Sequence, residues 1–489
     1  MSKYELENSI TIPFEAPEHD ELFIPWFVRG TIIDSDLVEY PLRSSKKIIF
    51  TPDASKHWSK LIQRNNRSYS ELQQLSCDDI IDFLVLVGQD LDFDTNPYIQ
   101  QAFEWNKEAS NLTTPIIERI YRDLPMIFSK KTLDAMVGMI GKKYLDGWVE
   151  QTDPFGSSAI RAVGAKVLHI PAGNIPTISA LSIINTALTK SDGLIKVPSN
   201  DPVTAGAIYQ TMLDLDPSHP INKHLAIAYW KGGDTTLERQ LIHPTQLEKI
   251  VAWGGRGSIS HIKQHVGPGI DLICMDPKFS ISVIGEETFS NPESIQEAAF
   301  RTALDCGYYN QEACLSSRVV YVKGTPAQAT TFGELLYQSL TKGDNPYSTK
   351  PKYYPNDLQQ SIDSIRYLDY LYTVYGGETG EGAVIVSQEY NDVVEFANTL
   401  CAKTINVVPI NNYSDVEMEI NIATQTIGIY PATLKKDLRD IFVQAGTQRI
   451  VTLGGAAWGM IGIPQDGIEL IRRIVKWVTD ENHTNQLSN

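Results

Sequence analysis

From residue 161 onward, short apolar runs alternate with longer stretches of helical hydrophobic spacing. The apolar runs that we read as strands lie within residues 165–170, 193–199, 223–230 and 248–255. Between them, apolar residues recur three or four positions apart, which is typical of amphipathic helices. This alternation predicts right-handed βαβ units and a parallel sheet that helices cover on both faces.

A second series begins near Pro292. Residues 292–306 have helical spacing, and strand-like runs follow at 317–324, 383–388, 404–410, 426–430 and 449–455. We expect helices between these runs, including one between 388 and 404. The two series predict two α/β domains that meet near residues 285–295.

The chain before residue 150 has a mixed pattern. Strands are expected within 22–33 and 47–50, and helices from 70 to about 147. The last ten residues are polar and predict a frayed tail. We therefore expect four regions: a mixed α+β region (1–150), a cofactor-binding domain (151–290), a catalytic domain (291–445) and a C-terminal segment packed back on the core (446–489).

The charge and hydropathy of the chain narrow its class of function. Its 489 residues carry a formal net charge of -17, which disfavours binding to nucleic acid or to an anionic membrane surface. No stretch approaches the roughly 18 consecutive apolar residues of a membrane span. The first residues, MSKYELENSI, lack the basic and apolar runs of a signal peptide. We expect a cytoplasmic enzyme.

The five cysteines are scattered, and no pair forms a C-x-x-C motif. An odd number in this arrangement argues against a disulfide framework and against structural zinc, so no metal site is predicted. A reducing cytoplasm would keep a catalytic thiol usable. The common phosphate-loop, nucleophile-elbow, zinc-protease and G-x-G-x-x-G motifs are absent, so a nucleotide site would need another construction.

Two loops carry candidate chemistry. In residues 169–176, two prolines and a glycine predict a loop at the carboxyl end of a strand, where open α/β sheets bind ligands. Asn174 in this loop would either donate a hydrogen bond to an oxyanion or cap the next helix. In residues 306–318, Cys314 lies between a predicted helix and a predicted strand. It would be either a nucleophile or a small buried apolar residue.

These loops occur in an ordered set of motifs that resembles the aldehyde dehydrogenase superfamily, most closely its LuxC-type branch of acyl-CoA reductases. The motifs are AGNIP around Asn174, LIKVPS around Lys196, GG at 232–233, HP at 243–244, VAWGGRGS ending at Ser258, QEAC ending at Cys314, RIVTLGG at 449–455 and GIPQDG at 462–467. The resemblance runs from about Lys166 to Val478. It implies an aldehyde dehydrogenase-like fold with two parallel-sheet domains and a mixed N-terminal region.

The resemblance also implies roles for individual residues. Cys314 would be the nucleophile and Asn174 the oxyanion donor. The cofactor would be bound by Lys196, Ser199, Gly232, Gly233, Gly257 and Ser258.

Three positions depart from the pattern of the superfamily. Hydrolytic members carry a general-base glutamate four residues before a lysine, and here Cys274 occupies that place before Lys278. Position 274 is therefore expected to face the nucleophile, although Cys274 itself has the pattern of a core strand residue. Gln465 stands where LuxC-type members tend to have histidine. The glutamate that contacts the cofactor ribose in the superfamily is missing from its expected place before residues 404–410.

Without a base to activate water, an acyl-cysteine is not readily hydrolysed and can instead exchange with a thiol or accept hydride. The resemblance thus implies a reductase that converts acyl-CoA, or a carrier-bound acyl thioester, to a fatty aldehyde. Ser199 replaces a carboxylate that would repel a 2′-phosphate, which favours NADPH, with NADH as the alternative. An acyl-transferring protein partner and a homo-oligomer are expected. An acid-forming aldehyde dehydrogenase, a reductase of acyl phosphates and a catalytically silent scaffold remain alternatives.

Overall fold

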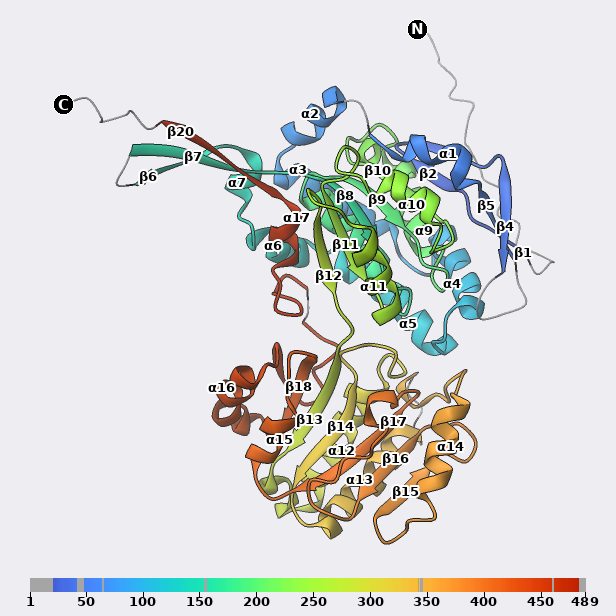
Figure 1. Cartoon of the computed structure of the whole chain (residues 1–489), viewed down its shortest axis with the longest axis vertical. Coiled ribbons are helices and arrows are strands. Elements are labelled where there is room, and N and C mark those ends of the chain that lie inside the picture. The colour runs from blue at the N-terminus through green and yellow to red at the C-terminus, as the bar shows by residue number, and fades with distance from the viewer. Residues whose placement is uncertain are drawn as a thin grey trace.

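The computed structural model describes residues 21–41, 48–63, 66–153, 156–341, 343, 346–459 and 461–482. These residues form two seven-stranded and two three-stranded sheets. Figure 1 shows the two large sheets in separate bodies, one above the other, with a three-stranded sheet that projects from the upper body. Helices cover both large sheets, which confirms the predicted α/β class.

The first large sheet is built on five parallel strands in the order β12-β11-β8-β9-β10. They are β8 (Lys166–Ile170), β9 (Asp192–Lys196), β10 (Leu225–Ala228), β11 (Lys249–Trp253) and β12 (Asp271–Met275). The runs that were predicted as strands are therefore confirmed. Their side chains are mostly buried because helices lie on both faces, as expected for a parallel sheet.

The connections of this sheet are helical. They contain α8 (Thr177–Leu188), α9 (Thr204–Leu215), the short 3-10 helix η1 (Asn222–His224), α10 (Thr235–Leu241) and α11 (Arg256–His265). Each connection leaves the carboxyl end of one parallel strand, so the intervening loops gather at one edge of the sheet.

The second large sheet has the order β15-β16-β17-β14-β13-β18-β19. Its parallel strands are β13 (Phe279–Ile284), β14 (Ser317–Lys323), β16 (Ala383–Ser387), β17 (Thr404–Ile410), β18 (Thr424–Tyr430) and β19 (Arg449–Thr452). The edge strand β15 (Tyr372–Gly376) runs antiparallel to β16. The cofactor-binding domain was expected to extend to residue 290, but β13 (Phe279–Ile284) belongs to the second sheet. Only three residues connect it to β12 of the first sheet.

The helices of the second body are α12 (Pro292–Gly307), α13 (Pro326–Thr341), α14 (Asn356–Ile365), α15 (Tyr413–Glu419) and α16 (Lys435–Ala445), with 3-10 turns η2 (Glu286–Ser290), η3 (Pro346–Ser348) and η5 (Ala432–Leu434). The helix expected between 388 and 404 is wrong, because that segment contains only the short η4 (Ala397–Thr399). There the backbone N–H of Val394 donates to the side chain of Asn406 in β17 (3.1 Å). This N–H is therefore not used in a helical hydrogen bond.

The N-terminal region contributes to several layers. Strands β1 (Glu21–Phe23), β4 (Leu37–Pro41) and β5 (Ile48–Pro52) form a small sheet, while β2 (Trp26–Val28) and β3 (Thr31–Ile33) extend the first large sheet. The helices that follow are α1 (Ala54–Leu61), α2 (Asn66–Gln74), α3 (Cys77–Asp90), α4 (Pro97–Ala109), α5 (Thr114–Ile127), α6 (Lys130–Gly138) and α7 (Lys142–Asp146). Helices α3, α4 and α5 pack on α8 and α9 and bury the largest apolar cluster.

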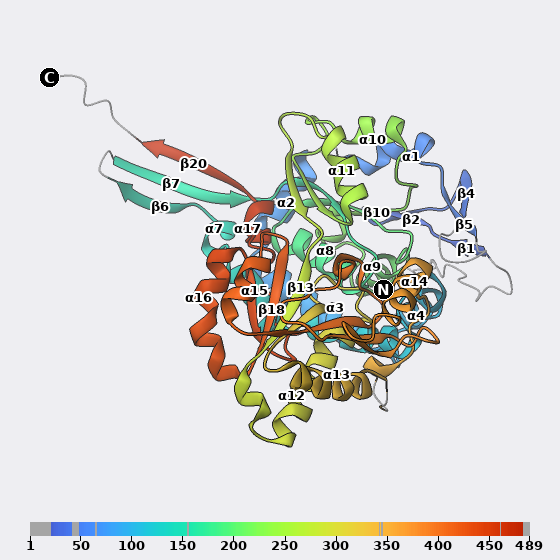
Figure 2. The same cartoon turned by 60° about the horizontal axis from the view of Figure 1, so that its bottom comes forward.

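The projecting sheet joins distant parts of the chain. It contains β6 (Val149–Asp153), β7 (Gly156–Val163) and β20 (Lys476–Asn482), and β20 follows the short helix α17 (Leu470–Ile474). Figure 2 shows the same projection from a second direction. The predicted frayed tail is wrong for residues 480–482, which pair with β7, and residues 483–489 lie outside the described part.

Candidate active site

A cavity of about 930 Å³ lies between the two bodies. Its upper wall consists of the loops at the carboxyl ends of β8 to β12, and its lower wall includes the segment that enters the amino end of β14. The predicted site residues that line it are Cys314, Asn174, Lys196, Ser199, Gly232 and Ser258. Gly233 and Gly257 do not line it, although each is next in sequence to a residue that does.

Cys314 lies in the loop between α12 and β14, as predicted. The loop turns sharply at Asn310 and Gln311, whose φ angles of 54° and 63° are left-handed. The buried Gln311 amide donates to the carbonyls of Ser317 (2.9 Å) and Thr404 (2.8 Å), and its oxygen accepts the Thr404 N–H (2.9 Å). These three bonds fasten the loop to the second sheet, so the position of the thiol is fixed by buried polar contacts.

The Cys314 thiol is partly exposed toward the cavity. Burial, and after it the neighbouring charge of Asp466, raises its pKa to about 11. Hydrogen bonds from the Gln425 side chain and from the backbone at Cys314 and Leu315 act in the opposite direction. The thiol is therefore protonated near neutral pH and needs a proton acceptor before it attacks a carbonyl.

Gln425 and Asp466 were not found by sequence analysis. The Gln425 amide, at the start of β18, donates to Cys314 Sγ (3.1 Å) and to Asp466 Oδ1 (2.5 Å). Asp466 lines the cavity, and burial raises the pKa of its carboxyl group. The only sequence signal was the motif at 462–467, which contains Asp466 beside Gln465, and Gln465 also lines the cavity.

Asn174 does not cap α8. The residue at the helix N-cap is Pro176, and no side chain makes a capping hydrogen bond there, so that alternative is wrong. Instead, the Asn174 Nδ2 donates to the carbonyl of Glu312 (2.8 Å), two residues before Cys314. A side-chain amide has two N–H groups, so the second can still donate toward the cavity. Gly173 lets this loop pack closely, because a Cβ there would lie 2.0 Å from Asn200 Oδ1.

A polar part of the wall lies around the ends of β9 and β11. Lys196 ends β9, and its Nζ lies 5.4 Å from the centre of the Trp230 ring. Gly232 lies beside this lysine, since a Cβ there would be in ordinary van der Waals contact with Nζ, at 3.9 Å. Ser258 belongs to the first turn of α11, whose N-cap is Gly255. A helix N-terminus with free N–H groups suits a phosphate.

Another part of the wall is apolar. Helices α5 and α8 contribute aliphatic side chains, and the flanking loops add more: Ile120, Met126, Ile127, Ile178, Leu181, Ile175, Leu315 and Ile461. Such a surface favours a hydrocarbon chain over a polar substrate. The cavity thus combines a thiol, a polar region and an apolar region.

The C-terminal segment closes part of this cavity. Asp305, at the end of α12, accepts the N–H groups of Gly454 and Ala456, each at 2.8 Å. Burial raises the pKa of Asp305 to about 6. Trp458, which follows on the same loop, lines the cavity and packs edge-on against Tyr308. Asp305 therefore positions a loop that carries part of the wall.

Cys274 does not face the nucleophile, and the expectation for position 274 is wrong. Its side chain packs with the apolar cluster beneath α11, whereas the next residue, Met275, lines the cavity. Successive side chains of a strand point to opposite faces of the sheet, so two neighbouring residues of β12 cannot both face the cavity. Cys274 is a partly buried strand residue at the margin of this apolar cluster.

Among the described helices, none combines the length and apolar character needed to cross a bilayer. The fold resembles solved aldehyde dehydrogenases. Lactaldehyde dehydrogenase from Escherichia coli superposes with a TM-score of 0.70 at 11% identity, over 95% of this chain and 100% of that chain. NADP-dependent glyceraldehyde-3-phosphate dehydrogenase from Bacillus halodurans C-125, complexed with NADP, gives 0.71 at 10% identity, with 95% and 100% covered. The predicted aldehyde dehydrogenase-like fold is confirmed.

Sequence comparison identifies the branch of this fold. The chain is 27% identical over 483 residues to the long-chain acyl-protein thioester reductase of Vibrio harveyi, with 95% of this chain and 94% of that protein covered. The model of the acyl-CoA reductase (LuxC) family matches residues 72–477. Because this match spans most of the 489 residues, the chain belongs to the acyl-CoA reductase (LuxC) family.

Proposed function

We propose that this protein reduces long-chain acyl thioesters to aldehydes through an acyl group carried on Cys314, with hydride from NADPH or NADH. The observation that carries the proposal is the composition of the cavity, in which one thiol borders both a phosphate-compatible polar wall and an apolar wall. The substrate is acyl-CoA or a carrier-bound acyl thioester, and the name of the Vibrio harveyi relative supports a protein-bound donor.

Acylation begins when the Cys314 thiol loses its proton and attacks the thioester carbonyl. Among the carboxylates that line the cavity, we assign Asp466 as the proton acceptor, because it shares the Gln425 amide with the sulfur. Gln425 then stabilises the thiolate through its 3.1 Å contact. The C–S bond to the leaving thiol breaks, and that thiol departs with the proton that Asp466 had taken.

The negative oxygen formed during attack needs hydrogen-bond donors. We assign this role to the second N–H of the Asn174 amide and to the backbone N–H of Cys314. The bond from Asn174 to the Glu312 carbonyl (2.8 Å) holds the amide beside the nucleophile loop before substrate arrives. Donors that are already in place cost no reorganisation when charge develops.

The polar wall fits a reduced nicotinamide dinucleotide. Lys196 and Ser199 would contact the ribose and its phosphate, and the first turn of α11 with Ser258 would face the pyrophosphate. Gly232, Gly233 and Gly257 would leave room for the dinucleotide. When bound, the cofactor supplies the hydride that reduces the acyl group. The C–S bond to Cys314 then breaks, which releases the aldehyde, and the sulfur takes up a proton. Ser199 in place of a carboxylate favours NADPH.

Two further features bear on this assignment. The apolar Met275 lines the cavity on the strand that, by the resemblance, carries the general base in hydrolytic members, which favours aldehyde over acid as product. The five cysteines are free, which suits a cytoplasmic enzyme. We also propose a homo-oligomer that receives acyl groups from a protein partner.

Product analysis tests the function. The protein is incubated with a long-chain acyl-CoA and NADPH, or with NADH, while cofactor oxidation and aldehyde are measured in the same reaction. We expect one aldehyde for each cofactor oxidised and little free acid. Acid as the main product, or cofactor oxidation without aldehyde, would overturn the proposal.

A further inference from the structure

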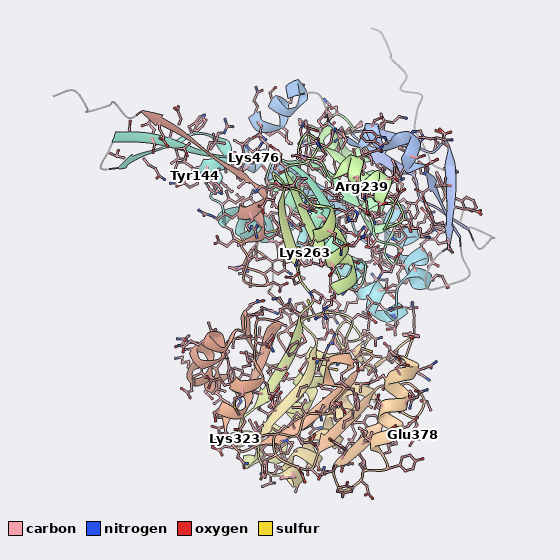
Figure 3. All side chains as sticks on the ribbon, viewed as in Figure 1. Tyr144, Arg239, Lys263, Lys323, Glu378 and Lys476 are labelled. Atoms are coloured by element: carbon pink, nitrogen blue, oxygen red, sulfur yellow. The ribbon has the colours of Figure 1, made fainter. Side chains whose placement is uncertain are left out.

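A second cluster of chemically active side chains lies between α10 and α11. Glu238 on α10 and two histidines one helical turn apart on α11, His261 and His265, each offer one ligand atom within 4.8 Å of the other two. Figure 3 labels Arg239 and Lys263, which are close in sequence to this cluster on the same two helices.

The carboxylate of the cluster is held in place. Glu238 is buried, its Oε1 accepts the N–H of Gly233 (3.3 Å), and its Oε2 lies 2.5 Å from His261 Nε2. One oxygen is therefore oriented by the backbone while the other faces the imidazole. A buried carboxylate needs hydrogen bonds, an oppositely charged partner or a metal ion to offset its lost hydration.

The second histidine is oriented as a metal ligand would be. His265 Nδ1 lies 2.8 Å from the carbonyl oxygen of His261, so this nitrogen donates and Nε2 keeps its lone pair. Hydrogen bonding of one imidazole nitrogen to a carbonyl is the usual support for coordination through the other. The two rings are 4.4 Å apart and tilted by 40°, so they are not locked in a parallel stack.

We infer that Glu238, His261 and His265 form a binding site for one zinc-class divalent cation. Two imidazoles and one carboxylate are a ligand set that zinc prefers, with bonds of about 2.0–2.2 Å. The ligand atoms would lie roughly 3.4 Å apart around a tetrahedral ion, so small side-chain rotations bring the present cluster to that geometry. The ion would replace the proton between Glu238 and His261, and the lone pair of His265 Nε2 would also bind it.

Space for a fourth ligand is present. A small cavity of about 10 Å³ adjoins the cluster and is lined by all three residues, together with Lys196 and Trp230. This is close to the volume that a single water needs. The inference does not rest on the proposed acyl reduction, because zinc binding is measured without substrate or cofactor.

Calorimetric titration of the full chain with zinc chloride tests the inference. We expect one site that Glu238→Gln, His261→Gln and His265→Gln each weaken by at least about 100-fold. His243→Gln is the matched control, because this exposed histidine contacts Thr245 and lies outside the cluster. Cys314→Ser serves as a second control for zinc held by the reactive thiol.

His265→Gln is the decisive variant, since it leaves the pair of Glu238 and His261 intact. Its thermal unfolding without metal should match that of the unaltered protein, whereas the rise in Tm that zinc causes should disappear. Equal zinc affinity in His265→Gln and the unaltered protein, or loss of binding in Cys314→Ser alone, would overturn the site and leave an ordinary hydrogen-bonded pair.

Discussion

Two cysteines, one that lines the cavity and one in a strand that leads to it, show how position decides the chemistry of a thiol. Cys314 lies on a loop that buried polar bonds hold at the cavity, whereas Cys274 lies in β12 among apolar neighbours beneath α11. Burial raises the pKa of both thiols, so neither is activated by a lowered pKa.

The difference lies in the groups that surround each sulfur. Cys314 has an amide donor at 3.1 Å, a carboxylate on that same amide, and open space for a substrate. Cys274 lines no part of that cavity. A buried, protonated thiol becomes a useful nucleophile only where a base and a carbonyl can reach it.

The largest expected effect separates the two thiols directly. Cys314→Ala should lower aldehyde formation by more than about 10³-fold, because removal of a nucleophile leaves only binding and orientation. Cys274→Ala should change the rate less than about twofold and cost about 1 kcal/mol of stability from lost packing. Rates are measured on both variants after thermal melts show that each is folded. Substantial activity in Cys314→Ala would end the comparison.

The next effect concerns the donor that faces Cys314. Asn174→Ala should lower kcat by roughly 10²–10³-fold, the usual effect of losing one oxyanion donor, with cofactor affinity nearly unchanged. Steady-state kinetics and cofactor titration measure both quantities. If the variant keeps its kcat per folded molecule, Asn174 only braces the loop through Glu312.

Asp466→Asn should slow acyl transfer to Cys314 but quicken the alkylation of its thiol. Acyl transfer should slow by roughly 10²-fold, because the proton acceptor is lost. Removal of the negative charge also lowers the pKa of Cys314, so alkylation by iodoacetamide at a fixed pH should quicken, by about tenfold for each pKa unit.

The pH dependence of alkylation provides the reference for this variant. With a thiol pKa of about 11, the rate in the unaltered protein should rise about tenfold per pH unit between about pH 7 and 10, without a plateau. Slower alkylation in Asp466→Asn would show that this carboxylate does not raise the thiol pKa. A plateau below pH 9 would show a more acidic thiol than burial implies.

The smallest effect tests the two faces of β12. Met275→Glu should raise the ratio of acid to aldehyde, because its carboxylate would reach water over the acyl-cysteine, whereas Cys274→Glu should not. Burial will raise the pKa of either new carboxyl group, so the ratio is measured at about pH 8. A rise in Cys274→Glu alone would restore the expectation from the sequence.

Local features of the fold were predictable because local signals report them. Strand runs such as 165–170 and the loop that carries Cys314 follow from hydrophobic spacing, and the order of motifs indicated the superfamily. The prediction of a helix between 388 and 404 was wrong, because the backbone N–H of Val394 donates to Asn406 in the next strand and not within a helix.

Contacts between distant residues were not predictable. Gln425 is 111 positions from Cys314, and Glu238 is 23 positions from His261, so neither pair forms a motif. Which face of β12 turns toward the cavity depends on how α11 packs, and a step of one residue reverses it. The four-residue spacing before Lys278 placed position 274 on the correct strand but on the wrong face of the sheet.

Trapping of the acyl group tests the central claim most directly. The unaltered protein is incubated with a labelled long-chain acyl-CoA in the absence of cofactor, and the site of the label is read by peptide mass spectrometry. We predict a hydroxylamine-sensitive label on Cys314 that NADPH discharges as aldehyde. A label on Cys274 or another residue, or a label on Cys314 that NADPH leaves in place, would contradict the account.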